Sequence, residues 1–280
     1  MVAGVVILYN PDDSVIKNVK SYIGFLERLY VLDNSDVYNQ HVIDFCKSNQ
    51  HIVYINNGLN LGVAKALNLA CEVSIEEGYQ WLLTMDQDSF IKEGFFDIAK
   101  ATMLDASNII ITASYNSIFF MPQISKYAGF VEIGTVITSG NLLNLIGWKS
   151  LGGFCEKLFI DEVDNEFCIR ATKKGYKIQA TKDVYLDHNL GVKYTKANRL
   201  TGKSLNFTMH SPFRVYYMTR NNLFLWKRYL FINPALVYNR IWNFIKLIYE
   251  ITFYYPDKLS YYKNVAKGVF HFFISKYDKM

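Results

Sequence analysis

Short apolar runs alternate with amphipathic segments along the first part of the chain. A short apolar run bounded by turn residues is typical of a buried strand, and apolar residues at helical spacing are typical of an amphipathic helix. The predicted strands are residues 3–9, 29–32, 51–55 and 81–85, and the predicted helices are residues 14–25, 38–48 and 62–77. This strand–helix alternation with short connections predicts an α/β fold, in which helices cover both faces of a parallel sheet.

The pattern is less regular after residue 90. An alternating segment at residues 127–138 favours an antiparallel strand. The remaining predicted elements are helices at residues 92–104, 141–151 and 164–174 and strands at residues 109–114 and 177–181. Because neither a linker nor a repeat interrupts the chain up to residue 226, we expect residues 1–226 to form one domain and residues 227–280 a helical extension.

Residues 235–254 in the extension have the spacing of an amphipathic helix. Its predicted polar side carries Asn239, Asn243, Lys246 and Glu250, and its predicted apolar side carries Ile241, Phe244, Ile245, Ile248 and Thr252. The extension holds nine Lys or Arg against three Asp or Glu, whereas the rest of the chain is almost neutral. Basic and aromatic residues together favour an anionic membrane surface; packing on the first domain or a homodimer interface explains them equally well.

Composition narrows the class of protein. The 280 residues are 51% hydrophobic and 16% aromatic, which excludes a disordered chain. The four cysteines have neither the spacing of a metal site nor that of a disulfide framework, and they indicate a cytoplasmic protein. Neither a signal peptide nor a transmembrane run is apparent, so any membrane contact is expected to be peripheral.

The predicted strand at residues 81–85 ends in two carboxylates, Asp86 and Asp88. Ligands of open α/β sheets bind in the crevice outside the carboxyl ends of the strands. Residues i and i+2 of an extended segment point the same way, and two like charges this close repel unless a cation or a proton lies between them. A hard divalent cation with oxygen ligands meets that need, although a solvated strand end is the simpler explanation of the D-x-D pattern alone.

Other polar residues follow strands at the same predicted edge. Tyr9 ends the first strand. Asp33 ends the second, where a carboxylate can accept a hydrogen bond from a nucleobase or a ribose hydroxyl; a local Asx turn is the alternative. Gly62 opens a helix, where the backbone can approach a ligand closely and present free N–H groups. The surrounding sequence lacks the G-x-G-x-x-G and P-loop patterns, so it is neither of those nucleotide-binding motifs.

A dense group of carboxylates begins another predicted helix. Its members are Asp161, Glu162, Asp164 and Glu166. The N-terminus of a helix favours acidic residues, but four of them exceed what capping needs. Carboxylates forced together have separated pKa values, so one of them can serve as a general base.

His188 directly follows Asp187. A carboxylate next to a histidine can orient that imidazole as a metal ligand; an ordinary hydrogen-bonded histidine is the alternative. Further along, one face of a predicted helix and its flank carry Arg214, Tyr217, Arg220 and Asn221. Arginine forks suit phosphate oxygens. A solvated helix face is the alternative, but the segment is largely apolar, and arginine in apolar surroundings usually has an anionic partner.

Taken in order, these motifs resemble glycosyltransferase family 2, the inverting enzymes with the GT-A fold, over residues 2–226. The matching segments are V-V-I-L-Y-N-P, V-L-D-N-S, N-L-G-V-A-K-A-L-N, M-D-Q-D and the pair Val163-Asp164. Val163 departs from the glutamate that is usual in the family. Three segments resemble the rhamnosyltransferase branch instead: F-I-D-E-V-D-N-E, His188-x-Leu190-Gly191 and R-x-x-Y-x-x-R-N.

The resemblance implies a nucleotide-diphospho-sugar donor, with dTDP-rhamnose expected, and a saccharide or lipid-linked saccharide acceptor. Asp164 takes the place of the catalytic base, while Asp88 and His188 would hold Mg²⁺ or Mn²⁺ on the diphosphate. The implied nucleotide-sugar residues are Tyr9, Asp33, Gly62, Asp86, Arg214, Tyr217, Arg220 and Asn221. The implied fold is a mostly parallel, Rossmann-like GT-A sheet, with acceptor pockets expected in residues 115–140 and 190–212, and the expected location is the inner face of the cell membrane.

Three other interpretations were weighed against this one. A UDP-hexose donor, carrying galactose or glucose, fits the same motifs. A sugar-phosphate nucleotidyltransferase also needs acidic metal ligands, but it requires a Gly-rich basic loop after the first strand, where this chain has Y-N-P-D-D. A nucleic-acid-binding protein is disfavoured because the positive charge is confined to residues 227–280, so we expect no nucleic-acid partner.

Overall fold

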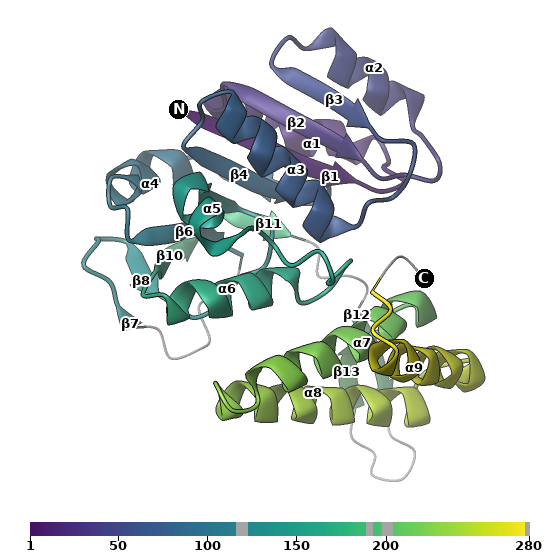
Figure 1. Cartoon of the computed structure of the whole chain (residues 1–280). Coiled ribbons are helices and arrows are strands. Elements are labelled where there is room, and N and C mark those ends of the chain that lie inside the picture. Colours follow the sequence, from purple (N-terminus) through teal and green to yellow (C-terminus); the bar gives the residue numbers. More distant parts are fainter. Residues whose placement is uncertain (116–122, 189–192, 198–203, 278–280) are drawn as a thin grey trace. The chain divides into compact units, whose positions relative to one another are not determined.

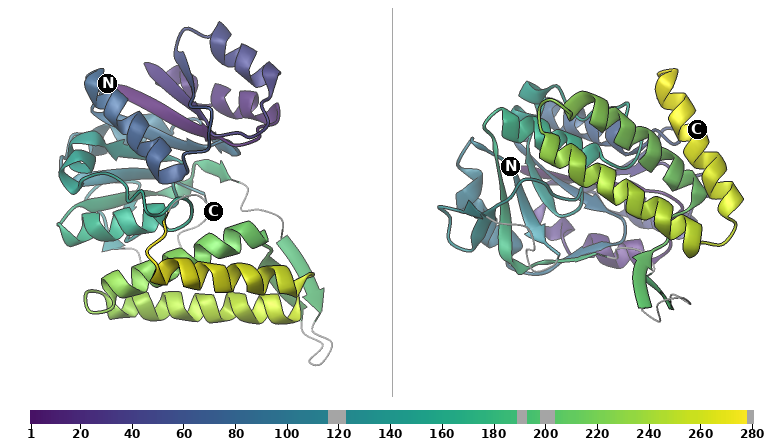
Figure 2. Two further views of the ribbon diagram at one scale, coloured as in Figure 1. Left: turned by 45° about the vertical axis from the view of Figure 1, so that its right-hand side comes forward. Right: turned by 90° about the horizontal axis from the view of Figure 1, so that it is seen from below.

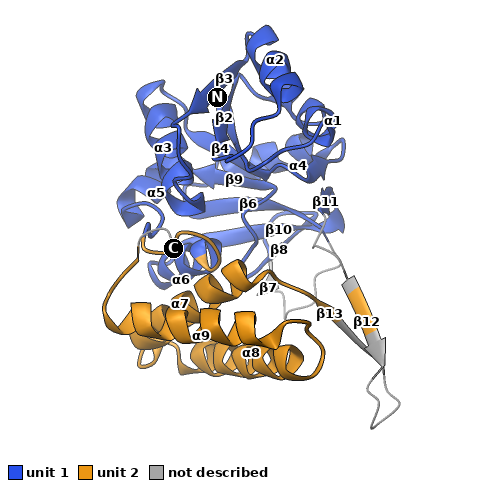
Figure 3. Ribbon diagram, turned by 90° about the vertical axis from the view of Figure 1, so that its right-hand side faces the viewer, with its two compact units in different colours: residues 1–156, 163–189 blue, residues 157–162, 190–280 orange. Residues whose placement is uncertain are grey.

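The computed structural model describes residues 1–115, 123–188, 193–197 and 204–277. The chain divides into two compact units, which Figure 3 shows in different colours. Unit 1 comprises residues 1–156 and 163–189, and unit 2 comprises residues 157–162 and 190–280. Unit 2 therefore takes in residues ahead of 227 as well as the predicted helical extension, because the helix at residues 212–229 packs with the C-terminal helices.

A nine-stranded sheet in the order β3-β2-β1-β4-β9-β6-β10-β8-β7 forms the centre of unit 1 (Figures 1 and 2). Its strands are β1 (Val2–Leu8), β2 (Arg28–Asp33), β3 (Ile52–Asn56), β4 (Trp81–Asp86), β6 (Asn108–Ser114), β7 (Gln123–Ile124), β8 (Phe130–Glu132), β9 (Asn141–Asn144) and β10 (Lys177–Val184). β3, β2, β1 and β4 are parallel to one another, β9 runs antiparallel between β4 and β6, and β8 runs antiparallel to β10. The predicted mostly parallel sheet is confirmed.

Helices cover both faces of this sheet. They are α1 (Ser14–Lys20), a 3₁₀ turn η1 (Ile23–Phe25), α2 (Gln40–Ser48), α3 (Val63–Glu76), α4 (Phe95–Met103), α5 (Leu145–Leu151) and α6 (Val163–Lys173). One apolar cluster joins α1, α2 and α4 to one face of the sheet, and α3, α5 and α6 lie on the other (Figure 1). Burial on both faces explains why the parallel strands are continuous apolar runs rather than alternating ones.

The helix predicted at residues 141–151 is shorter than expected, because residues 141–144 form strand β9. Hydrogen bonds to β4 on one side and β6 on the other hold this apolar segment extended. Asn144 then caps α5, since its side-chain oxygen accepts hydrogen bonds from the backbone N–H groups of Ile146 and Gly147 at 3.1 Å each. Tertiary pairing has overridden the local helical pattern here.

A second, two-stranded sheet was not expected from the sequence. It pairs β5 (Ser89–Ile91) with β11 (Leu186–His188) in antiparallel fashion. Both strands are only three residues long, so neither carries enough alternation to be recognised by pattern.

The described residues of unit 2 form the helices α7 (Pro212–Tyr229), α8 (Pro234–Phe253) and α9 (Lys258–Phe273) and a hairpin of β12 (Lys193–Ala197) and β13 (Ser204–Thr208). Its apolar core includes Val215, Leu247, Ile251, Tyr254 and Tyr255. None of the helices in the described part of the chain has both the length and the apolar character needed to cross a bilayer.

The helix predicted at residues 235–254 is confirmed as α8, and its predicted polar and apolar sides hold except at two residues. Glu250 was assigned to the polar side and is only 7% exposed, and its burial raises the pKa of the carboxyl group. Ile245 was assigned to the apolar side and is 52% exposed. The helix turns a largely aromatic side outward, because the core of unit 2 takes only some of its apolar residues.

Gly268 lets α9 approach α7 closely. A Cβ atom at this position would lie 2.8 Å from the backbone oxygen of Tyr216, which no side-chain rotation can relieve. Overpacking costs ~1–3 kcal/mol, which outweighs the gain of about 1 kcal/mol that Ala brings to a helix.

We therefore expect Gly268→Ala to lower the free energy of unfolding, as measured by denaturant titration. In the control Gly24→Ala, the added Cβ meets nothing within 4 Å and stability should be retained; equal effects of the two substitutions would contradict the close-packing argument.

Candidate functional site

Several predicted site residues gather at the carboxyl edge of the main sheet. In the parallel register, Leu8 of β1 lies beside Asp33 of β2, and Ile7 of β1 lies beside Asp86 of β4. Tyr9 follows β1 directly, so it belongs to the same edge. The sequence-based placement of these residues at one edge is confirmed.

Two carboxylates and an imidazole meet at this edge. One ligand atom each from Asp86, Asp88 and His188 lie within 4.8 Å of one another. His188 is brought there by the β5–β11 pairing, in which it lies opposite Ser89, the residue after Asp88. The His188 Nδ1 atom is 3.3 Å from Asp88 Oδ1 and 2.8 Å from Ser89 Oγ. Two carboxylate oxygens and one imidazole nitrogen are a donor set that fits a divalent cation such as Mn²⁺ or Mg²⁺.

Electrostatics around His188 favour positive charge. Burial lowers the pKa of this histidine, but its hydrogen bond with Asp88 and the charges of Asp86 and Asp88 raise it, and the net shift is upward. Asp187, which the sequence suggested as the orienting partner, instead forms an ion pair with Lys92 at 3.2 Å. Successive residues of a strand point to opposite faces, which is why Asp187 and His188 have separate partners.

Gln87, between the two aspartates, ties this turn to β1. Its side-chain oxygen accepts a hydrogen bond from the Tyr9 N–H at 2.8 Å, and its side-chain nitrogen donates to the Tyr9 carbonyl at 3.2 Å. Asn18 donates to the Gln87 backbone oxygen at 2.9 Å. Sequence reasoning did not single out Gln87, although an amide between two carboxylates is a candidate for such a bracing role. These bonds hold the Asp86–Asp88 turn against the end of β1.

Asp33 is buried and already has hydrogen-bond partners within the protein. Its carboxylate accepts from the Tyr54 hydroxyl at 2.5 Å and from the Ser35 backbone N–H at 2.9 Å, so the predicted Asx turn is formed. Burial and the bond to Asp33 raise the pKa of Tyr54. Tyr9 is 48% exposed, and its hydroxyl donates to Asp36 at 2.9 Å. The roles of Asp33 and Tyr9 toward a nucleoside stay predictions.

Gly62 occupies the position before α3 with φ 78° and ψ 168°. This is a backbone conformation that an L side chain disfavours, so the glycine is required by geometry. Its N–H donates to the Asn60 side chain at 2.8 Å, and its carbonyl accepts from the Asn34 side chain at 3.4 Å. The loop that enters α3 is therefore braced against the end of β2.

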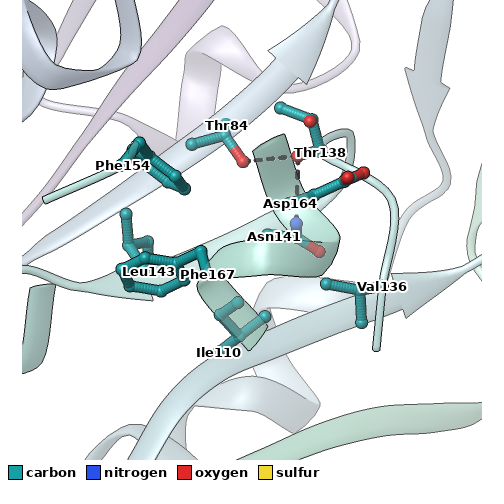
Figure 4. A pocket seen from close by; sticks show the side chains of 9 residues that line it. All are labelled: Thr84, Ile110, Val136, Thr138, Asn141, Leu143, Phe154, Asp164 and Phe167. Atoms are coloured by element: carbon teal, nitrogen blue, oxygen red, sulfur yellow. Dashed lines mark hydrogen bonds between the residues drawn. The ribbon is translucent and has the colours of Figure 1, made fainter. Parts of the chain in front are cut away.

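Asp164, the second residue of α6, lines a narrow cavity in unit 1 (Figure 4). The remaining lining residues are Thr84, Ile110, Val136, Thr138, Asn141, Leu143, Phe154 and Phe167. The Thr138 carbonyl accepts hydrogen bonds from the side chains of Thr84 and Asn141. The cavity is thus mostly apolar, with a few oriented polar groups and one carboxylate.

The three other carboxylates of the acidic group each have an arginine partner. Asp161 pairs with Arg214 at 2.8 Å and Glu162 with Arg240 at 2.7 Å. Glu166 is fully buried, and Arg170 donates to both of its oxygens at 2.9 Å. The Arg170 guanidinium also donates to the carbonyls of Leu151 and Gly153 at 2.6 Å each. Structural ion pairs therefore account for the acidic residues Asp161, Glu162 and Glu166, and Asp164 lines the cavity.

The arginine-rich motif of α7 holds the segment at residues 157–162. Arg220 is fully buried and donates to the Lys157 carbonyl at 3.0 Å. Asn221 donates to the carbonyls of Ile160 and Asp161 at 2.7 and 3.0 Å. The rings of Tyr217 and Phe159 stack with centroids 5.1 Å apart, and Arg214 binds Asp161 as described above.

These contacts give the motif a clear structural task within unit 2. The donor-binding role that the sequence suggested for Arg214, Tyr217, Arg220 and Asn221 stays a prediction. Of the segments expected to bind the acceptor, residues 116–122, 190–192 and 198–203 lie outside the described residues.

Residues 5–146 match the model of glycosyl transferase family 2. The chain is 27% identical over 242 residues to a dTDP-rhamnosyl transferase, RfbF, of Shigella flexneri, an alignment that covers 80% of this chain and 79% of that protein.

Solved structures show the same fold at low identity. The S. aureus TarS fragment 1–349 in complex with UDP-GlcNAc matches with a TM-score of 0.60 and 12% identity, over 96% of this chain and 80% of that one. GalNAc-T7 with UDP, GalNAc and Mn²⁺ matches with a TM-score of 0.57 and 12% identity, over 67% of this chain but only 43% of that one. The predicted GT-A fold is confirmed, and together with the family-model match this shows that the chain belongs to glycosyl transferase family 2.

Proposed function

We propose that this glycosyltransferase moves L-rhamnose from dTDP-rhamnose onto a saccharide or lipid-linked saccharide acceptor, with inversion at the anomeric carbon. The observation that carries the proposal is the meeting of Asp86, Asp88 and His188 at the carboxyl edge of the sheet. The choice of sugar is supported by the relative that is named a dTDP-rhamnosyl transferase.

The proposed reaction is a single displacement. The acceptor hydroxyl attacks the anomeric carbon and loses its proton to Asp164, while the bond from that carbon to the diphosphate oxygen breaks. Asp88 and His188 would hold Mg²⁺ or Mn²⁺, which supplies positive charge to the departing diphosphate. Asp86 would bind the nucleoside, together with Tyr9, Asp33 and the Gly62 backbone. In this scheme Arg214 and its neighbours on α7 serve the diphosphate and also hold residues 157–162.

The main alternative keeps the reaction and changes the donor to UDP-galactose or UDP-glucose. A panel of nucleotide sugars, scored by metal-dependent hydrolysis, separates the two. Turnover of dTDP-rhamnose well above both UDP-hexoses supports the proposal, and preference for a UDP-hexose rejects the rhamnose assignment while leaving the transferase itself in place.

Asp164→Asn tests the catalytic base. An amide cannot accept the acceptor proton, and general-base assistance is worth ~10²–10⁴-fold. We expect turnover to fall by about that factor while dTDP-rhamnose binds nearly as well, since Asp164 does not contact the nucleotide in the proposed scheme. The control Asp97→Asn changes an exposed carboxylate on α4, whose ion-pair partner is Lys100, and it should leave turnover intact. Normal turnover of Asp164→Asn would falsify the assignment.

Asp88→Ala and His188→Ala test the metal ligands. Loss of an outer-shell partner costs ~10–100-fold in metal affinity, so loss of a direct ligand should cost about 100-fold or more. Titration calorimetry of dTDP in the presence of Mn²⁺ should show this loss, with metal-free binding unchanged. Asp187→Ala is the matched control, because that carboxylate pairs with Lys92. If all three variants bind dTDP and Mn²⁺ like the parent, the metal assignment is wrong.

We propose in addition that Arg240 is a positioning residue for Asp164. Asp161 and Glu162 have φ values of 63° and 65°, and the left-handed conformation costs a non-glycine residue ~1–2 kcal/mol. Arg214 and Arg240 hold these two side chains, and α6 with Asp164 begins immediately afterwards. Without the Arg240 pair, Glu162 can relax and change where α6 starts.

Arg240→Gln should therefore lower kcat about tenfold, equivalent to ~1.4 kcal/mol in the activation barrier, with little change in donor KM. Arg240→Lys keeps the charge and should restore part of the loss. Lys173→Gln, at the exposed end of α6, serves as the control with unchanged kcat. A rise in donor KM with constant kcat would show that Arg240 acts in donor binding instead.

A further inference from the structure

A set of large apolar side chains is exposed on unit 2. It starts at the turn between α7 and α8 with Leu230, Phe231 and Ile232, and it continues along α8 with Tyr238, Trp242, Ile245, Tyr249 and Phe253. Phe231 is 94% exposed, Tyr238 68% and Trp242 61%. We refer to these eight residues as the α8 ridge.

The positions on α8 follow helical spacing, at steps of three or four residues. They therefore form one stripe along the length of the helix. The other side carries the buried residues Val237, Leu247 and Ile251, of which Leu247 and Ile251 pack in the core of unit 2. Because the fold already fills its core without the ridge, these side chains are available to a partner outside the chain.

Positive charge accompanies the ridge. Lys227 and Arg228 are exposed and lie directly before the apolar turn. Lys246, on α8, is largely exposed as well, with its ammonium group 3.8 Å from Glu250. Residues 227–280 carry nine Lys or Arg against three Asp or Glu. A partner for this surface must therefore accept both apolar insertion and positive charge.

We propose that the α8 ridge docks on an anionic lipid bilayer, with the turn at Leu230–Ile232 inserted among the acyl chains and α8 lying in the interface. Tyr and Trp rings suit the boundary between headgroups and acyl chains, since each has an apolar body and a polar tip. Lys and Arg beside such a helix bind anionic headgroups. A face-to-face pair of two copies would instead bring their positive charges together, which opposes self-association.

Co-sedimentation with vesicles tests the surface directly. The parent protein should bind vesicles of phosphatidylcholine with phosphatidylglycerol more tightly than vesicles of phosphatidylcholine alone. The double variant Phe231→Ser with Trp242→Ser should bind the anionic vesicles about tenfold more weakly or worse, because two large apolar groups no longer leave water. Lys227→Gln with Arg228→Gln should reduce only the preference for anionic lipid.

The control is a variant with the same chemistry elsewhere. Leu104 and Ile146 in unit 1 are 89% and 71% exposed, so Leu104→Ser with Ile146→Ser removes exposed apolar surface outside the ridge. This variant should bind vesicles like the parent. Equal weakening by both double variants would show that binding is a general effect of surface hydrophobicity and would overturn the proposal.

Tryptophan fluorescence provides a readout on the unmodified chain. All four tryptophans lie in the described residues, and Trp242 is 61% exposed whereas Trp81 and Trp148 are each 5% exposed. Anionic vesicles should shift the emission to the blue, and lipids brominated in the acyl chains should quench it. Trp242→Phe should remove most of both effects while sedimentation with vesicles persists.

These experiments measure lipid binding and not enzyme activity, so their outcomes are distinct from those that test glycosyl transfer. The membrane proposal is rejected if the parent protein does not bind anionic vesicles. It is also rejected if the protein binds them without any change in the fluorescence of Trp242. Sedimentation velocity tests the other possible occupant of the ridge, a second copy of this chain. The ridge would be assigned to that second copy if the parent forms a dimer that the Phe231 and Trp242 substitutions dissociate, and if the parent does not bind vesicles.

Discussion

The antiparallel pairing of β5 with β11 is the constraint on which the candidate metal site depends. Asp86 and Asp88 come from the end of β4 and are near each other through local sequence alone, but two carboxylates repel. The pairing sets His188 opposite Ser89 and so adds an imidazole to the two oxygens. Gln87 holds the turn between the aspartates on the end of β1, which keeps the donor atoms from spreading apart. A pair of three-residue strands thus decides whether the edge of the sheet can bind a cation.

A second constraint concerns the acidic segment before α6. Carboxylates that lose contact with water need a positive partner, and a buried one without such a partner is costly. Arginines meet this need for Asp161, Glu162 and Glu166. The arginines of α7 and α8 thereby hold Asp161 and Glu162, whose backbone is left-handed, immediately before the helix that carries Asp164. In the proposed mechanism, carboxylates that form structural ion pairs and the carboxylate that acts as the base lie within one helical turn of each other in the sequence, but they have different roles.

The outward side of α8 follows from competition for a small core. The helix has more large apolar residues than the centre of unit 2 can take, since α7, α9 and the tyrosines after α8 already supply much of it. The residues at the favoured positions, such as Leu247 and Ile251, are buried, and the remaining aromatic side chains are left outside. Glu250 is drawn inward by its place beside the buried residues, within 3.8 Å of the Lys246 ammonium group. Helical periodicity alone cannot tell which of two apolar sides is buried.

The sequence by itself determined the parallel half of the sheet, its helices and the edge on which Tyr9, Asp33 and Asp86 lie, because each depends on local periodicity and on the rule that parallel strands end together. Spacing alone marked the acidic group without distinguishing its members, and the family resemblance singled out Asp164. Only the tertiary structure decided that residues 141–144 are a strand, that the β5–β11 pairing brings His188 to the aspartates, and that arginines distant in sequence pair with Asp161 and Glu162. Those outcomes depend on pairing between residues far apart in the chain, and neither spacing nor propensity encodes which distant partner supplies the hydrogen bond or the opposite charge.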